Sequence, residues 1–219
     1  MNIVEIQILS DDLEQTEKFY SDLLGLKTSY EDKSTISFIA GASVLTFTKS
    51  ENKKPYYHFA FNIPHNQIYE ALEWMKTKTG IIQLTLESRI ADFTAWNAKS
   101  FYFYDNNGNI LEFIARYDLK NASKKPFNVS SILYISEIGI VKDDALAASK
   151  VFVVENDFLL FTKAASPDKE FAVLGDDHGL LIIVKEGRDW YPTDKKAIKF
   201  WSKITVKENE MVTDIITGT

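Results

Sequence analysis

The stretch SFYFYDNNGNILEFIAR, residues 100–116, is the most informative part of the sequence. Apolar residues alternate on both sides of a polar centre, which is typical of two short β-strands. The centre, DNNGN, predicts a turn, because Gly108 tolerates positive φ and the Asn and Asp side chains can bond the local backbone. The stretch therefore predicts a β-hairpin. Glu112 lies among apolar residues of its second strand, where an uncompensated carboxylate is costly to bury. We expect it to face water, pair with a cation or bind a metal.

The composition excludes several classes of protein. The chain has 219 residues, enough for one large domain or two small ones. Its net charge of −6 argues against a nucleic-acid surface, and the absence of cysteine removes disulfides, thiolate nucleophiles and Cys-ligated metal sites. The first residues do not resemble a secretory signal, and no apolar run approaches the roughly 18 residues that span a bilayer. We therefore expect a cytoplasmic protein, a monomer or homodimer, without a nucleic-acid or membrane partner.

The first unit of the chain begins with NIVEIQIL, residues 2–9, whose alternation predicts a strand with Glu5 and Gln7 on one face. Ser10 or Asp11 is expected to cap a helix that ends at Gly25. Short apolar runs follow at 27–31, 35–40 and 43–49. The chain thus opens with a β-α-β-β-β unit.

A second unit of the same kind starts at residue 56. A strand is expected at 56–63, with a helix from Pro64. Further strands are expected at 81–87, 100–104 and 110–115, with a loop at 88–99, and residues 118–125 are polar and predict a linker. The third unit has a strand at 131–141, a helix from about Asp144 and strands near 157–162, 170–174 and 179–185. A lone strand at 197–206 follows, and the tail 208–219 is either a short helix or disordered.

An internal repeat connects the two halves. VEIQILSDD at 4–12 and SEIGIVKDD at 136–144 align without gaps and place Glu137 opposite Glu5. The fold is therefore α+β, built from tandem β-α-β-β-β units, three nearly complete and a fourth truncated. We divide the chain into a domain at 1–117 and a second at 128–219, which holds the third unit and the truncated fourth.

Three motifs carry a resemblance to a known family. They are EIQILSDDLEQTEKFYSDLLGL at 5–26, YYHFAFNIP at 56–64 and FYFYDNNGNILEF at 101–113. In this order they resemble the vicinal oxygen chelate superfamily, also called the glyoxalase/bleomycin resistance protein/extradiol dioxygenase group. The likeness is best over 1–117, and continues more loosely through GDDHGLLIIVKEGRDWYP at 175–192.

The resemblance implies paired units whose curved, mixed sheets surround one cavity, with helices outside. Carried over by position, the metal ligands are Glu5, His58 and Glu112. Together they would suit a divalent Mn, Fe, Zn, Ni or Co ion with open positions for substrate. Two positions depart from the family pattern, because Glu5 stands where His or Gln is more common and Thr46 stands at a fourth ligand position. Gln7, on the same face as Glu5, is a substitute ligand or a supporting donor.

Other polar and aromatic residues complete the expected site. Arg89 and Trp96, on the loop before the hairpin, and Tyr102, on its first strand, are expected to contact substrate. Arg188 would either bind an anionic substrate group or form a surface salt bridge. Glu137 repeats Glu5 without evident partners, which predicts a structural echo of the duplication.

Three hypotheses for function follow. The first is a divalent-metal-dependent enzyme, a lyase, isomerase or dioxygenase that acts on a small oxygen-chelating substrate. The second is a metal-free protein that binds or sequesters a small molecule, as bleomycin-resistance proteins do. The third is a structural or regulatory module with a vestigial cavity. The sequence leaves the choice between enzyme and binding protein open, because fold alone does not determine function.

Overall fold

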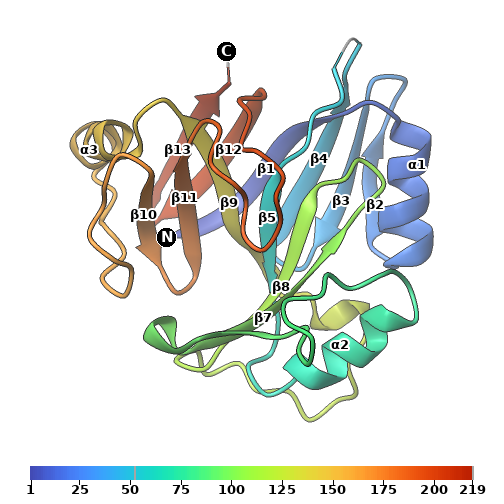
Figure 1. Cartoon of the computed structure of the whole chain (residues 1–219). Helices are drawn as coiled ribbons and strands as arrows, with labels where there is room; N and C mark the ends of the chain where they lie inside the picture. Colours follow the sequence, from blue (N-terminus) through green and yellow to red (C-terminus); the bar gives the residue numbers. More distant parts are fainter. Residues whose placement is uncertain (52, 219) are drawn as a thin grey trace.

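Residues 1–51 and 53–218, which the computed structural model describes, form two mixed β-sheets with three α-helices on the outside (Figure 1). The first sheet has the strand order β13-β12-β1-β4-β3-β2 and the second has the order β10-β11-β9-β5-β8-β7-β6. The predicted α+β fold of repeated units with helices outside is therefore confirmed. Among the described residues, no helix is both long enough and apolar enough to span a bilayer.

The strands of the first sheet come from both ends of the chain. They are β1 (Asn2–Ser10), β2 (Lys27–Glu31), β3 (Thr35–Ala40), β4 (Ser43–Lys49), β12 (Ser202–Glu208) and β13 (Met211–Thr217). The second sheet takes its strands from the middle of the chain. They are β5 (His58–Asn62), β6 (Ala91–Phe93), β7 (Ala98–Tyr104), β8 (Ile110–Arg116), β9 (Tyr134–Lys142), β10 (Phe171–Asp176) and β11 (Gly179–Lys185).

Each α-helix covers the strands of its own unit. Helix α1 (Leu13–Glu17) contacts β3 and β4, α2 (Ile68–Lys76) contacts β7 and β8, and α3 (Ala145–Asn156) contacts β9, β10 and β11. Asp12 caps α1 by accepting from the Gln15 backbone N–H at 3.0 Å, so the cap is neither Ser10 nor Asp11, which the sequence predicted. The helix continues as a π-helical turn, Lys18–Leu23.

The units pair across the linker rather than along the chain. Strand β5 of the second unit pairs antiparallel with β9 of the third, and β1 of the first unit pairs antiparallel with β12 of the fourth. The expected pairing of the first two units around one cavity is therefore corrected. The division into domains at 1–117 and 128–219 stays a prediction, but each sheet takes strands from both sides of it.

One face of the second sheet builds the core. Phe59 and Phe61 of β5 and Leu111 and Phe113 of β8 are fully buried in a cluster that also contains Ile6 and other residues of the first sheet. Alternation along the strands sends the intervening side chains to the opposite face. That opposite face is where the site lies.

The predicted hairpin forms, and its turn ties the two sheets together. Strands β7 and β8 pair antiparallel, and Gly108 has φ +73°. Asp105, buried in the turn, accepts from the Asn109 backbone N–H at 2.8 Å and from the Tyr20 hydroxyl at 2.6 Å. Because Tyr20 belongs to the π-helical turn of the first unit, these bonds join the hairpin to the other sheet.

Three expected elements differ from the structure. Within 81–87 only Ile81 bridges to a strand, and β6 forms instead inside the expected loop. Within 157–162 only Leu160 makes a bridge, with Leu174. The tail is a strand, since β13 pairs with β12 along its whole length; Thr219 lies outside the described residues. Each difference depends on a pairing partner, which the local pattern does not contain.

Candidate metal centre

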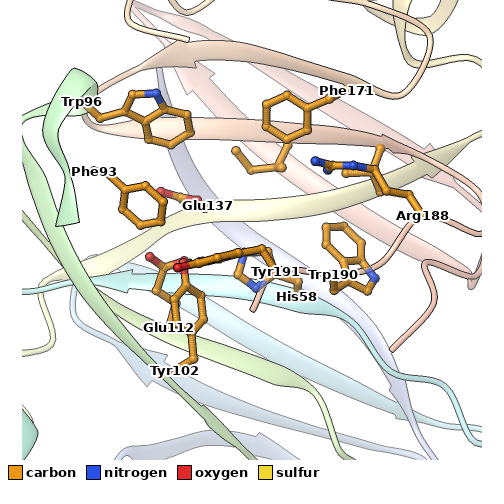
Figure 2. Close-up of a pocket in the computed structure, with 12 residues that line it drawn as sticks. His58, Phe93, Trp96, Tyr102, Glu112, Glu137, Phe171, Arg188, Trp190 and Tyr191 are labelled. Carbon is orange, nitrogen blue, oxygen red and sulfur yellow. Dashed lines mark ion pairs between the residues drawn. The ribbon is translucent and has the colours of Figure 1, made fainter. Parts of the chain in front are cut away.

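The face of the second sheet that points away from the core borders a cavity of about 250 Å³ (Figure 2). Its walls are mostly aromatic, and they come from β7, the β6–β7 connection, β10 and the segment after β11. The aromatic residues are Phe93, Trp96, Tyr102, Phe171, Trp190 and Tyr191. An apolar cavity with a few convergent polar groups is the usual form of a small-molecule site.

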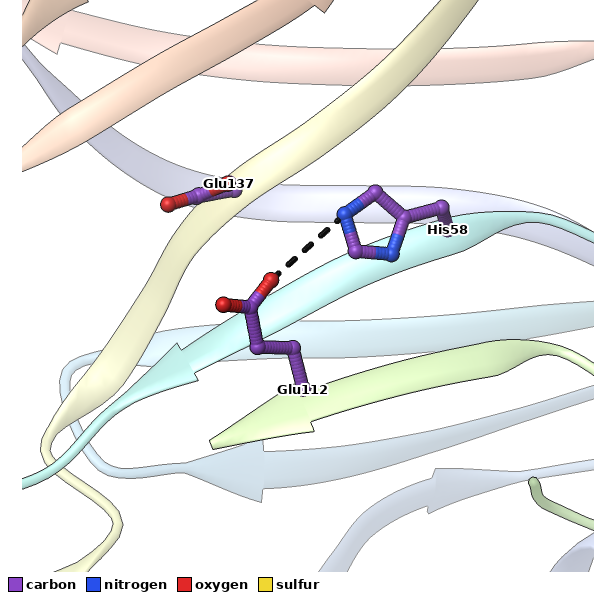
Figure 3. A group of neighbouring side chains, drawn as sticks. All are labelled: His58, Glu112 and Glu137. Atoms are coloured by element: carbon purple, nitrogen blue, oxygen red, sulfur yellow. Dashed lines mark ion pairs between the residues drawn. The ribbon is translucent and has the colours of Figure 1, made fainter. Parts of the chain in front are cut away.

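Three buried polar groups converge at this cavity, His58, Glu112 and Glu137 (Figure 3), and the exposed Arg188 also lines it. The three buried groups come from the three adjacent strands β5, β8 and β9, and Ala60 lies opposite both glutamates in the strand register. One ligand atom from each of the three side chains lies within 4.8 Å of the others. Long-range strand pairing therefore brings together one imidazole and two carboxylates.

His58 is held as a neutral ring with a free lone pair. Its Nδ1 lies 3.0 Å from the Ile110 carbonyl oxygen, which only accepts, so Nδ1 carries the proton. Nε2 then presents its lone pair 3.6 Å from Glu112 Oε2 (dashed line in Figure 3). Burial lowers the pKa of His58 to about 4, so the ring is neutral at pH 7 and the contact is not an ion pair.

Glu112 has an unpartnered oxygen. Its Oε1 is buried and accepts no hydrogen bond from the described residues, and Glu112 is only 2% exposed. Burial, and next the charge of Glu137, raises the pKa of Glu112 well above its usual range. A buried carboxylate without partners is unfavourable, so this side chain needs either a proton or a cation.

Glu137 already has a cation. Arg116, fully buried on β8, donates from Nη2 to Glu137 Oε1. Within the described part of the chain, the other guanidinium nitrogens Nε and Nη1 have no hydrogen-bond partner, and Nη1 lies 3.8 Å from Asp177 Oδ1. Burial raises the pKa of Glu137, and the adjacent Arg116 charge opposes that rise. Arg116 therefore balances the negative charge of Glu137 more directly than that of Glu112.

The residues present fit a divalent ion. The donor set is one imidazole nitrogen and two carboxylates, which suits Mn, Fe, Co, Ni or Zn. The hydrogen bond from Nδ1 of His58 to a backbone carbonyl is the usual support for a ligating imidazole, and the unpartnered Oε1 of Glu112 would gain a partner. Arg116 weakens the fit, because its charge competes for Glu137.

Trp190 closes one side of the cavity, and the sequence prediction missed it. Its ring packs on Gly139 of β9, where an added Cβ would lie 2.3 Å from ring atom Cη2. The ring centroid lies 5.4 Å from that of His58. The repeat contained a signal for this contact, because Gly139 stands where Gln7 stands in the first unit.

The structure places the predicted site residues in three different regions. His58, Glu112, Trp96 and Tyr102 line the cavity. Arg89 lines a separate depression, formed with α2, that includes Tyr69, Lys76, Asp92 and Lys99. Arg89 and Trp96 therefore lie at different depressions, although both come from the segment before the hairpin, and their contacts with substrate stay predictions.

Glu5 and Gln7 lie in the other sheet, on β1. The Thr46 hydroxyl donates to Glu5 Oε1 at 2.7 Å, and Glu5 is outside the group formed by His58, Glu112 and Glu137. The structure therefore groups His58 and Glu112 with Glu137 and not with Glu5. The physical reason is that β5 pairs with β9, which makes Glu137 a neighbour of His58. The ligand roles of Glu5, His58 and Glu112 stay predictions.

Comparison with known proteins supports the family. The model of the Glyoxalase/Bleomycin resistance protein/Dioxygenase superfamily matches residues 2–113, so the chain belongs to that superfamily, and the resemblance is confirmed. Comparison with curated proteins gave no significant match.

Solved structures share the fold at low identity. A glyoxalase I mutant from Zea mays is 16% identical, with a TM-score of 0.58, over 90% of this chain and 70% of that one. A glyoxalase/bleomycin resistance protein/dioxygenase from Nocardioides is 19% identical, with a TM-score of 0.44, over 58% of this chain and 90% of that one. The first match extends the likeness in fold over most of the four units.

Proposed function

We propose that this protein is a divalent-metal-dependent enzyme that holds its ion with His58, Glu112 and Glu137. The observation that carries the proposal is the convergence of their ligand atoms within 4.8 Å, with Glu112 Oε1 unpartnered. The substrate is a small molecule with oxygen donors, since the cavity of about 250 Å³ has no room for a large one.

The chemistry at the site divides between the ion and the chain. When bound, the ion supplies Lewis acidity toward substrate oxygens, as a lyase, isomerase or dioxygenase requires. His58 offers Nε2 because its other nitrogen is committed to Ile110. Burial, together with the neighbouring Glu112, raises the pKa of Tyr102 well above its usual range, so its phenol stays protonated and can donate at the cavity wall. The aromatic side chains give the cavity largely apolar walls around this donor.

Metal binding by Glu112→Gln and Glu5→Gln tests the proposal. After treatment with chelator, each protein is dialysed against Mn(II), Co(II) or Zn(II), and bound metal is measured by elemental analysis. We expect one equivalent in the wild type and in Glu5→Gln. The metal affinity of Glu112→Gln should fall by more than the roughly 10–100-fold that removal of an outer-shell partner causes.

The Glu5 variant is a matched control, because Glu5 occupies the same position in its repeat as Glu137 does. Absence of bound metal in the wild type, or equal losses in both variants, would overturn the proposal. Circular dichroism of each variant separates loss of the site from loss of the fold.

A second function is a metal-free binding protein. The observation that favours it is the Arg116–Glu137 ion pair, in which a side-chain cation already occupies part of the centre. A wild-type protein that binds no metal, yet gains thermal stability with small aromatic ligands, would support this alternative.

A further inference from the structure

Arg188 is an unpaired cation between two paired acids. Glu186 lies 3.2 Å from Lys199 Nζ, and Asp189 lies 2.6 Å from Lys196 Nζ. Both acids that flank Arg188 in the sequence are therefore committed to lysines. Arg188 has no carboxylate within ion-pair distance among the described residues, although it is exposed. The surface salt bridge that the sequence left open does not form.

An aromatic ring holds the guanidinium at the cavity instead. The Arg188 Cζ atom lies 4.8 Å from the centroid of the Phe171 ring. Figure 2 shows the side chain reaching back from its loop, between Phe171 and Trp190, toward the cavity. Stacking on a ring orients a guanidinium while leaving its edge donors free for an anion.

The cavity consequently has two different ends. Glu112 and Glu137 lie at one end and Arg188 at the other, beside Trp190, in Figure 2. Among the described residues that line the cavity, Arg188 is the single arginine or lysine, and His58 is neutral at pH 7. The volume of about 250 Å³ lies below the usual range for drug-sized ligands, and so suits a single ring with small substituents.

We infer that the cavity binds a small aromatic acid, with its ring between the aromatic walls and its carboxylate on Arg188. The inference rests on the proposed function only at the inner end, where ring oxygens would face the metal held by His58, Glu112 and Glu137. At the outer end it rests on Arg188, Phe171 and the cavity alone. A guanidinium binds a carboxylate through two parallel hydrogen bonds, which a neutral amide cannot reproduce.

Three probes test the inference: benzoate, its neutral analogue benzamide, and 3,4-dihydroxybenzoate, which adds vicinal oxygens. Affinities are measured by calorimetric titration in chelator-treated protein and again with Mn(II). We expect the wild type to prefer benzoate to benzamide by about tenfold, the usual effect of one charge-assisted contact at a partly exposed site. Arg188→Gln should abolish the preference and Arg188→Lys should keep part of it.

Arg89→Gln is the matched control, because Arg89 is also exposed but lines the other depression. It should leave the preference of the wild type unchanged. Equal affinities for benzoate and benzamide, or a preference that survives in Arg188→Gln, would overturn the inference. So would the absence of binding by any probe up to roughly 10 mM.

The two metal conditions separate this inference from the proposed function. A benzoate preference that depends on Arg188, in protein that binds none of Mn(II), Co(II) and Zn(II), would support the aromatic acid and overturn the metal proposal. Mn(II) binding without any preference for benzoate would support the metal proposal and overturn the aromatic-acid inference. Tighter binding of 3,4-dihydroxybenzoate with Mn(II) than without it would support both.

Discussion

The two sheets repeat one plan, and only one of them carries a candidate metal centre. In the first sheet, Glu5 on β1 precedes Gln7, which lies beside Thr46 of β4. In the second, His58 on β5 precedes Ala60, which lies beside Glu112 of β8. Thr46 and Glu112 are therefore equivalent positions. A threonine in place of a glutamate gives the first sheet a satisfied hydrogen bond instead of a cluster of ligands.

The two sheets also differ in the strand through which their two units pair, which is β9 in the second sheet and β12 in the first. In the second sheet β9 brings Glu137 beside β5, with Gly139 two residues later admitting the ring of Trp190. In the first sheet, β12 places Lys203 opposite Gln7, so Lys203 holds the position equivalent to that of Glu137. Its Nζ lies 2.8 Å from Asp214 Oδ2. Duplication thus supplies equivalent positions, and a few side chains determine which copy becomes a site.

The largest expected effect comes from Arg116→Met. This change leaves Glu137 buried without its cation, and we expect the metal-free protein to lose about 3–5 kcal/mol of unfolding free energy. Thr46→Val, which removes one neutral donor in the first sheet, should lose only about 1 kcal/mol. Urea unfolding with chelator present measures both. Similar losses in the two variants would show that the ion pair does not distinguish the sheets.

The second largest effect is expected from Gly139→Ala. The added methyl group would collide with the Trp190 ring, and overpacking of this kind lowers the unfolding free energy by about 1–3 kcal/mol. Displacement of the ring should also shift the tryptophan fluorescence to longer wavelength. Gln7→Ala, at the equivalent position of the first sheet, should change stability by less than about 0.5 kcal/mol. An unshifted spectrum in Gly139→Ala would contradict the packing described here.

The stability of the metal-free protein should depend on Glu112 above pH 6.5. Its pKa is raised in the folded state, so the unfolded chain binds fewer protons and stability falls as pH rises, by up to about 1.4 kcal/mol per pH unit. The lowered pKa of His58, about 4, has the opposite effect below pH 6.5, where rising pH restores stability.

Unfolding curves between pH 6.5 and 8 measure this dependence. Glu112→Gln, which cannot titrate, should show a flatter profile than the wild type. A wild-type profile as flat as that of the variant would mean that Glu112 is already ionised in the folded protein. A cation other than the neighbouring side chains would then have to balance its charge.

The smallest effect is expected from Glu5→Gln. The Thr46 hydroxyl can still donate to the amide oxygen, so the loss should stay below about 1 kcal/mol, and metal binding should not change. Urea unfolding and elemental analysis of the same sample measure both quantities. A loss of bound metal here would return Glu5 to the ligand set and remove the distinction between the sheets.

Local sequence was sufficient for several elements of this protein. The turn at 105–109 and Gly108 specify the hairpin by backbone chemistry alone, and the hairpin places Glu112 on the same face as Tyr102. The repeated openings predicted the tandem units, and the three motifs at 5–26, 56–64 and 101–113 predicted the family. His58 and Glu112, which belong to one unit, were both identified from the sequence and both line the cavity.

Tertiary structure alone determined the rest. Glu5 and Glu137 are equivalent in the repeat, and the choice between them depends on whether β5 pairs with β1 or with β9, a contact between distant parts of the chain. The same is true of Arg116, whose role comes from Glu137 across the sheet, and of β13, which needs the edge of β12. Periodicity in a sequence shows which face a side chain occupies, but free strand edges can pair with more than one partner, and packing selects among them.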